Sequence, residues 1–387
     1  MNGPTEAGLS GAGPSGPGPT GASRAAHRTG PTLDAPDAPG DPATARLLAD
    51  AARTVDAPDV VIAVSRYGER TVHRGGVAPA GPVPRELLRY ELGSASKPFA
   101  GLLLARLVAQ DRVRYEDRAA DLLAPGHPVH PAVRAITLRH LMTHTSGLPA
   151  LPADFYPQAV PRWSTDPYRG YPADRVVRAF LRARPRHRPG TRWHYSNFGV
   201  SVLGHTLAAA TGTPWEILLH QQVLGPLGLA ATLLRPGPAD TDATGHRRDG
   251  SPVPALDPGG FTAAGAVRST PLDLLTFLEA HLARPPGPAP ADPAAPADQT
   301  LAAALAEVVR PVLRRGWRHG HTHTLTWFRH PSPYGPVLFH AGATLGQQVF
   351  LGFRPESGLA IAATATRRVR RGVPFVATAY GLLTETL

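Results

Sequence analysis

Ser94 and Lys97 form the first pattern in the chain that could do chemistry. They lie three residues apart in SASKPFAGLLLARL (residues 94–107), at the start of an apolar stretch that predicts a helix. Residues three apart share one face of a helix, so the lysine amine can reach the serine hydroxyl. Burial would lower the pKa of the amine, and the neutral amine could then accept the hydroxyl proton. The pattern predicts an activated serine nucleophile.

Lys97 is the only lysine in the chain, and the other basic residues are arginines. Arginine could not replace a proton-accepting lysine, because its guanidinium stays protonated. An N-cap serine followed by an exposed lysine would give the same four letters. The nucleophile hypothesis therefore needs support from other parts of the chain.

Two further motifs supply that support. Tyr195-Ser196-Asn197 precedes an apolar helix, and His340-Ala341-Gly342 lies on a predicted strand. With these motifs in this order, the chain resembles the serine beta-lactamase and penicillin-binding-protein superfamily. The branch it resembles contains class C beta-lactamases, D-alanyl-D-alanine carboxypeptidases and related esterases. The resemblance extends over most of residues 45–387 and includes ITLRHLMTHTSGLP (136–149).

The resemblance implies a covalent acyl-enzyme mechanism. Ser94 would attack a carbonyl carbon, while Lys97 and Tyr195 share the proton transfers. Asn197 would hydrogen-bond a substrate amide or hold the lysine amine in place. The backbone N–H groups of Ser94 and Ala343 would form the oxyanion hole.

The third motif departs from the class C pattern. Class C beta-lactamases usually carry Lys-Thr-Gly there, and the lysine helps to bind the substrate carboxylate. A neutral His340 would bind a carboxylate less firmly, and Ala341 lacks the hydroxyl group. Gly342 still fits a strand edge that the substrate approaches closely. We therefore do not expect potent beta-lactamase activity, and we find no counterpart of the class A deacylating glutamate.

The order of predicted elements indicates an α/β (α+β) fold. Strands near both chain ends would form one antiparallel sheet flanked by terminal helices, and the helices between them would form an all-helical lobe. An enzyme cleft often lies between such lobes. The expected divisions are a disordered Gly/Pro-rich tail at 1–41, a sheet lobe at about 42–92 and 300–387, a helical lobe at about 93–282, and a Pro/Ala-rich insertion at 283–299.

The composition excludes several classes of protein. The 387 residues contain no cysteine, so disulfides, a thiolate nucleophile and a cysteine-based zinc site are ruled out. No apolar run predicts a membrane span. The formal net charge of +11 comes from scattered arginines with clusters at 182–192 and 367–371, neither interleaved with aromatic residues. We expect a solvated basic surface and no nucleic-acid partner; a polyanion site is the alternative.

The predicted function is that of a serine hydrolase with a Ser94 acyl-enzyme, acting as a cytoplasmic esterase or amidase on a small molecule without cofactor or metal. The cytoplasmic location rests on an N-terminus that lacks the pattern of a secretory signal. Three alternatives stay open: a D-alanyl-D-alanine carboxypeptidase or weak beta-lactamase, an acyltransferase or transpeptidase of natural-product metabolism, and a penicillin-binding sensor without turnover. The sequence indicates no oligomeric state.

Two groups of histidines have the spacing of metal ligands. His140 and His144 are four residues apart, but no glutamate completes an H-E-x-x-H motif, so we expect structural roles. His319, His321 and His323 alternate and could line one side of a strand. A metal site there is the alternative to an ordinary strand.

Overall fold

The computed structural model describes residues 41–79, 81–238, 240–282, 296–315, 321–369 and 374–387. Most of the predicted tail at 1–41 and most of the predicted insertion at 283–299 therefore lie outside the described residues. The last four residues of that insertion, 296–299, are not irregular, since they begin the helix α12 (Pro296–Val308).

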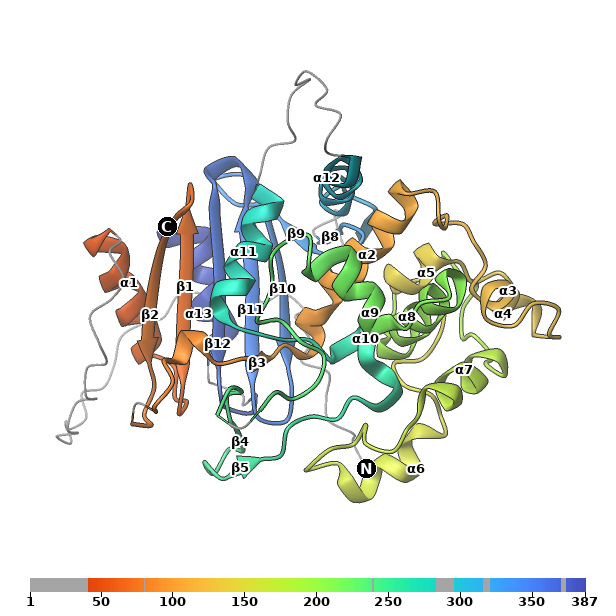
Figure 1. Cartoon of the computed structure of the whole chain (residues 1–387), viewed down its shortest axis with the longest axis horizontal. Helices are drawn as coiled ribbons and strands as arrows, with labels where there is room; N and C mark the ends of the chain where they lie inside the picture. Colours follow the sequence, from red (N-terminus) through yellow and green to blue (C-terminus); the bar gives the residue numbers. More distant parts are fainter. Residues whose placement is uncertain (1–40, 80, 239, 283–295, 316–320, 370–373) are drawn as a thin grey trace, which may run out of the picture. The chain divides into compact units, whose positions relative to one another are not determined.

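One antiparallel sheet of eight strands joins the two ends of the described chain (Figure 1). Its order is β2-β1-β12-β11-β10-β9-β8-β7, so the C-terminal strand β12 pairs with the N-terminal strand β1. This confirms the predicted antiparallel sheet. The strands are β1 (Val60–Arg66), β2 (Glu69–Gly75), β7 (Leu313–Arg315), β8 (His321–His323), β9 (Phe328–His330), β10 (Val337–Ala343), β11 (Gln348–Arg354) and β12 (Leu359–Ala365).

The central strands are apolar because both of their faces are covered. Every residue of β11 and β12 is buried, and neighbouring residues of a strand point to opposite faces. The buried apolar residues form two clusters, one on each face of the sheet. Ile361 belongs to the cluster that contains Leu48 and Phe375, whereas Ala362 belongs to the cluster that contains Phe277. Strands buried on both faces need continuous apolar sequence, which is what LAIAATA provides.

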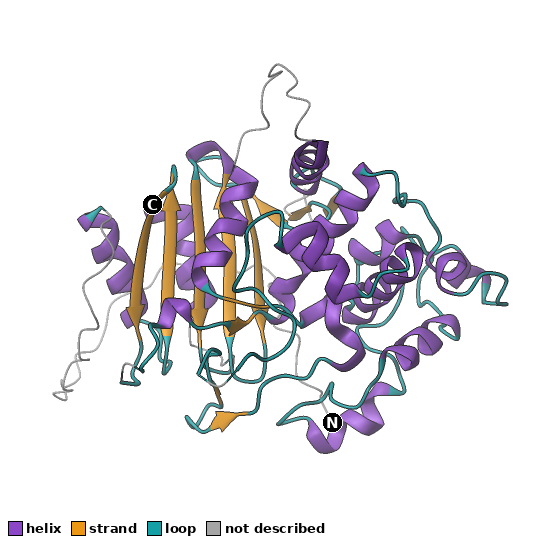
Figure 2. Ribbon diagram, in the orientation of Figure 1, coloured by secondary structure: helices purple, strands orange, loops and turns teal. Residues whose placement is uncertain are grey.

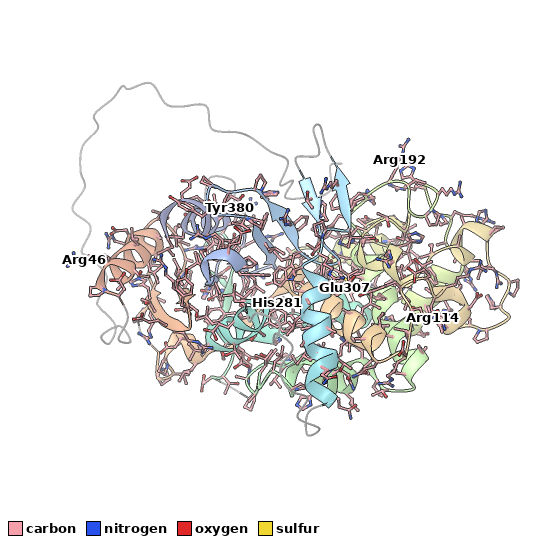
Figure 3. The ribbon with its side chains drawn as sticks, turned by 90° about the horizontal axis from the view of Figure 1, so that it is seen from above. Arg46, Arg114, Arg192, His281, Glu307 and Tyr380 are labelled. Carbon is pink, nitrogen blue, oxygen red and sulfur yellow. The ribbon has the colours of Figure 1, made fainter. Side chains whose placement is uncertain are left out.

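Helices from different parts of the chain cover the two faces. α1 (Pro42–Arg53) and α13 (Phe375–Gly381), which ends in the π-helical turn Leu382–Thr386, lie on one face, and α11 (Pro271–Leu282) lies on the other. Figure 3 shows Tyr380 of α13 and His281 of α11 on opposite sides of the sheet. The helix α11 therefore packs on the sheet, although its residues fall inside the predicted helical lobe.

The remaining helices gather beside the sheet, as Figure 2 shows. Two of them, α2 (Lys97–Ala109) and α8 (Asn197–Thr211), are buried on nearly all sides, which explains their lack of a polar face. No helix among the described residues is long and apolar enough to cross a membrane. The other helices are α3 (Ala119–Leu123), α4 (Pro131–Arg134), α5 (Leu138–Met142), α6 (Phe155–Ala159), α7 (Ala173–Leu181), α9 (Trp215–Leu219) and α10 (Thr262–Gly265).

Two short antiparallel pairs connect these parts. β3 (Tyr90–Glu91) pairs with β6 (Arg268–Ser269), and β4 (Gly245–His246) pairs with β5 (Pro252–Val253). β3 leads directly into the segment that carries Ser94. The pair β3–β6 therefore fixes the entry to the predicted first motif.

Candidate active site

Ser94 lies in a 3₁₀ turn, Gly93–Ser96, that runs into α2. Side chains three apart eclipse one another in a 3₁₀ helix, so Ser94 lies directly over Lys97. The sequence predicted the same proximity from an α-helix, and the structure reaches it through the tighter turn. The turn is held at its far side by Ser96, whose hydroxyl oxygen accepts the N–H of Val267 at 3.1 Å.

The 3₁₀ turn and the end of β10 meet backbone to backbone. A Cβ atom on Gly342 would lie 1.9 Å from the carbonyl oxygen of Leu92, and one on Gly93 would lie 2.4 Å from that of Ala343. Gly93 also has a φ of +49°, which favours glycine. These two glycines allow the N–H groups of Ser94 and Ala343 to approach one region, and Ala343 is exposed there.

Lys97 is fully buried, and its amine contacts only neutral groups among the described residues. Its Nζ atom lies 3.0 Å from the Ser94 Oγ, 2.8 Å from the Asn197 Oδ1 and 3.0 Å from the Ala264 carbonyl oxygen. Burial lowers the pKa of this amine from 10.5 to about 7. The side chain therefore exchanges its proton near neutral pH.

The three partners of the amine determine what its neutral form can do. The Asn197 Oδ1 and the Ala264 oxygen can only accept hydrogen bonds, so they take the two hydrogens of a neutral amine. The lone pair then faces the Ser94 hydroxyl, the one partner that has a proton to give. In its protonated form the amine donates its third hydrogen to the same oxygen. The geometry is that of a base and the hydroxyl it deprotonates.

Asn197 begins α8 and is held from both ends of its amide. Its Oδ1 accepts from Lys97, and its Nδ2 donates to the Tyr168 hydroxyl at 3.4 Å. Burial raises the pKa of Tyr168 to about 12, so this partner stays neutral. Of the two roles considered for Asn197, the structure shows its contact with the lysine amine.

Tyr195 stands beside the amine on the segment that enters α8. The Lys97 Nζ lies 4.8 Å from the centre of the Tyr195 ring, and the side chain is half-buried. The ring of His144 also packs against Tyr195, with 4.4 Å between ring centres and a tilt of 37°. Tyr195 thus contacts both the base and a buried imidazole.

His340 lies on β10 and is buried. Its Nδ1 is 2.9 Å from the Ala341 carbonyl oxygen, and its ring centre is 5.3 Å from that of Phe328. Burial, then the nearby charge of Lys97 and that of His323, lower the pKa of His340 to about 3. The imidazole is therefore neutral at any pH at which Lys97 can act.

Comparisons with known proteins agree with this arrangement. A family model described as Beta-lactamase matches residues 44–384. The chain belongs to the beta-lactamase family. It is 25% identical over 341 residues to a beta-lactamase of Pseudomonas fluorescens, covering 79% of this chain and 87% of that one. It is 30% identical over 177 residues to the esterase EstB of Burkholderia gladioli, covering 44% and 45%.

A solved structure shows the same fold. The beta-lactamase/D-alanine carboxypeptidase of Pseudomonas syringae superposes with a TM-score of 0.71 at 21% identity, covering 87% of this chain and 98% of that one. This likeness confirms the predicted fold. The resemblance read from the three motifs is confirmed by the family model, and the relatives named above are serine hydrolases.

Two contacts of this beta-lactamase family member were not found from the sequence. The Ala264 carbonyl oxygen comes from α10, and no side-chain type marks a backbone acceptor. His144 accepts the N–H of Ser196 at 3.1 Å through its Nδ1, and its own carbonyl oxygen accepts the N–H of His194 at 2.8 Å. Its φ of +58° is unusual for a residue with a side chain, and no sequence pattern signalled it.

The other histidines take separate positions. His140 shares a capping box with Thr137 at the start of α5, so it does not act together with His144. His323 of β8 packs against Trp193, with 5.4 Å between ring centres, while His319 lies outside the described residues. No group of three or more His, Asp or Glu side chains among the described residues is placed to hold a metal ion.

Proposed function

We propose that this protein hydrolyses small esters or amides that are uncharged at the reacting end, through an acyl-enzyme on Ser94. The observation that carries the proposal is the neutral, buried His340 on the strand beside the nucleophile. Class C beta-lactamases usually hold a lysine at this position of the motif for the substrate carboxylate. Here Lys97 is the only cation in contact with Ser94 among the described residues, and it is engaged as a base.

The first half-reaction follows from the contacts of Lys97. The neutral amine takes the proton of the Ser94 hydroxyl while the oxygen attacks the carbonyl carbon. The negative charge that develops on the carbonyl oxygen is stabilised by the backbone N–H groups of Ser94 and Ala343. The C–O or C–N bond then breaks, and the leaving group takes a proton from Lys97 through Tyr195, which lies next to the amine. The acyl group stays on Ser94.

The second half-reaction reverses these roles. A water molecule gives one proton to Lys97 through Tyr195 while its oxygen attacks the acyl carbon. The bond between the acyl carbon and the Ser94 Oγ then breaks, Lys97 returns the proton to that oxygen, and the acid leaves. Asn197 holds the amine in place through both steps, because its Oδ1 is bonded to Nζ while the Tyr168 hydroxyl fixes its other end. The same residues would serve in turnover of either an ester or an amide.

The competing functions differ in whether the third motif, His340-Ala341-Gly342, must bind a substrate carboxylate. A D-alanyl-D-alanine carboxypeptidase or a beta-lactamase must bind a carboxylate next to the reacting bond, which favours a cation. An acyltransferase would use an alcohol or amine in place of water, and a sensor would stop at the acyl-enzyme. The esterase EstB among the relatives supports hydrolysis of esters. The cytoplasmic location stays a prediction.

A substrate panel tests the proposal. The purified protein is given p-nitrophenyl esters of short acids, nitrocefin and a peptide ending in D-Ala-D-Ala, and acyl-enzyme is followed by intact mass. We expect sustained ester turnover, kcat/KM at least about 100-fold lower for the two carboxylate-bearing substrates, and loss of the acyl adduct in Ser94→Ala. A preference for the peptide, or a single burst without turnover, would overturn the proposal. Faster product formation with added alcohols would indicate the acyltransferase.

A further inference from the structure

A recess of about 370 Å³ on this protein is lined by Arg247, Arg248, Asp249 and Arg368. It lies where the hairpin of β4 and β5 meets the segment that follows β12, at one end of the large sheet (Figure 1). Nothing in the mechanism above uses these residues. We propose that the recess binds a phosphate-bearing small anion.

Hydrogen bonds join the two segments, so their arginines converge in the folded protein. The N–H of Arg368 donates to the His246 carbonyl oxygen at 2.9 Å, and Arg248 Nη2 donates to the Val369 carbonyl oxygen at 3.4 Å. Arg367 Nη1 donates to the Arg248 carbonyl oxygen at 3.2 Å. These bonds cross between stretches more than a hundred residues apart in sequence, and they fix the walls of the recess.

The lining of the recess is positively charged. The lining carries three guanidinium groups and one carboxylate, and no ion pair joins them in the described part of the chain. Asp249 is turned to Ser251, whose N–H and hydroxyl donate to its Oδ1 at 2.9 and 2.7 Å. Arg247 Nη1 donates to the neutral oxygens of Ser251 and Pro252. The guanidinium groups of Arg247 and Arg248 are therefore positioned by neutral oxygens, and the lining keeps its net positive charge for a ligand.

The charge and the shape of the lining groups indicate the class of ligand. The lining has a formal charge of +2, which matches a phosphate monoester at neutral pH, and its three planar guanidinium forks suit a group with three oxygens better than a carboxylate with two. None of the described residues that line the recess is aromatic, so they offer no platform for stacking of nucleic-acid bases. A small anion fits these features better than a strand of nucleic acid.

The recess also adjoins the strand that ends at the oxyanion position. Ala343 pairs with Gln348, whose Nε2 donates to the Arg367 carbonyl oxygen at 2.9 Å, and the N–H of His246 donates to the Gly346 carbonyl oxygen at 3.0 Å. A phosphate in the recess is thus connected by two short links to the turn after β10. It could belong to a free effector or to the distal part of a substrate.

Calorimetric titration of the full chain with pyrophosphate at low ionic strength tests the site without relying on turnover. We expect saturable binding that falls at least about tenfold in Arg247→Gln/Arg368→Gln, because charge-assisted hydrogen bonds are lost. The matched control Arg46→Gln/Arg114→Gln removes two exposed arginines elsewhere and should leave binding unchanged (Figure 3). Equal weakening in both double variants, equal binding of acetate, or tighter binding of a single-stranded oligonucleotide would overturn the proposal.

Kinetics then separate the two sources of the phosphate. A free effector changes the hydrolysis of uncharged p-nitrophenyl butyrate as pyrophosphate saturates the protein. A phosphate that belongs to the substrate instead lowers the KM of an ester with a phosphate on its acyl chain, relative to the uncharged ester. In either case the effect is lost in Arg247→Gln/Arg368→Gln and kept in the control variant. Both readouts require ester turnover, whereas the calorimetric test stands even if the proposed hydrolysis fails.

Discussion

Lys97 and Arg268 are two buried basic side chains on neighbouring elements, and their hydrogen-bond partners differ in charge. Arg268 of β6 donates to the Glu91 carboxylate at 2.8 Å and lies 3.9 Å from that of Asp242. Lys97 has neutral partners, and its nearest contact to β6 is through Ser96, which binds the backbone of Val267. The arginine keeps a permanent charge beside a carboxylate, and the lysine is left to lose its charge.

The difference shows what a buried base requires. A carboxylate beside Lys97 would favour the charged amine and keep its pKa high, so the amine could not accept the Ser94 proton near neutral pH. Burial without a carboxylate does the reverse and brings the pKa to about 7. Elsewhere in the chain a fixed charge suffices and arginine supplies it, which explains why the single lysine lies at this position.

The largest expected effect is that of putting an arginine where the lysine is. Lys97→Arg keeps the positive charge but cannot release a proton, so kcat/KM for an ester should fall about 10²- to 10⁴-fold, as far as in Lys97→Met. Steady-state hydrolysis of p-nitrophenyl butyrate measures it, and far-UV circular dichroism controls for folding. An active Lys97→Arg enzyme would show that charge alone is needed.

The next largest effect is the loss of stability when Arg268 is replaced. Arg268→Met leaves the Glu91 carboxylate buried beside a neutral side chain, so the free energy of unfolding should fall by about 3–5 kcal/mol. The double variant Arg268→Met/Glu91→Met removes both charges and should recover a large part of that loss. Urea denaturation of the three proteins measures the difference. A single variant as stable as the wild type would mean that the two groups are not coupled.

The pH dependence of stability gives a third contrast. The pKa of Lys97 is lower in the folded protein than in the unfolded chain, so the unfolded chain binds the proton more tightly. Burial of the amine therefore lowers the free energy of unfolding most below pH 7, and this loss disappears as the pH approaches 10.5. Between pH 6 and pH 10 the wild type should therefore gain on the order of 4 kcal/mol relative to Lys97→Met. Urea denaturation of both proteins at both pH values tests this. The same difference in free energy of unfolding at pH 6 and pH 10 would contradict the lowered pKa.

The smallest expected effect is that of replacing His144, a neutral side chain beside Tyr195. His144 is buried, and its ring packs against Tyr195. Burial, and then the charge of Lys97, lower the pKa of His144 well below the usual value. Asparagine at this position keeps an acceptor for the Ser196 N–H and tolerates a positive φ, but it removes the ring contact. His144→Asn should lower kcat about tenfold with little change in KM or in the free energy of unfolding.

His144→Ala separates this positioning role from a purely structural one. Alanine removes the acceptor as well as the ring, so it should also destabilise the fold by about 1–3 kcal/mol. If the asparagine variant loses stability rather than kcat, His144 serves the fold and not the orientation of Tyr195.

The fold and the catalytic motifs could be predicted because they depend on the types of side chain and on their order in the sequence. Ser94, Lys97 and Asn197 are read from the sequence, and the structure brings their side chains together. The terminal strands and the closing helix follow from apolar runs bounded by turn residues. The hairpin between β1 and β2 turns at Tyr67 and Gly68, which both have positive φ.

The remaining features depend on contacts that no local pattern encodes. The Ala264 carbonyl oxygen and the unusual backbone of His144 become visible only in three dimensions. The short strands β7 and β9 have too few residues for a clear alternating pattern, so the full width of the sheet was not predicted, although the alternating histidines indicated a strand at β8. The arginine recess was seen only as a cluster at 367–371, because its other half lies on a distant hairpin.

The central claim is that Lys97 is a neutral base near physiological pH, and the composition allows a direct test. Because the chain has a single lysine, protein labelled with ¹³C at the lysine ε carbon gives one side-chain signal, which reports the titration of this amine. The account predicts a midpoint at about pH 7 that coincides with the rise of kcat/KM for ester hydrolysis. A midpoint near the ordinary value of 10.5, with hydrolysis already at full rate at pH 7, would contradict it.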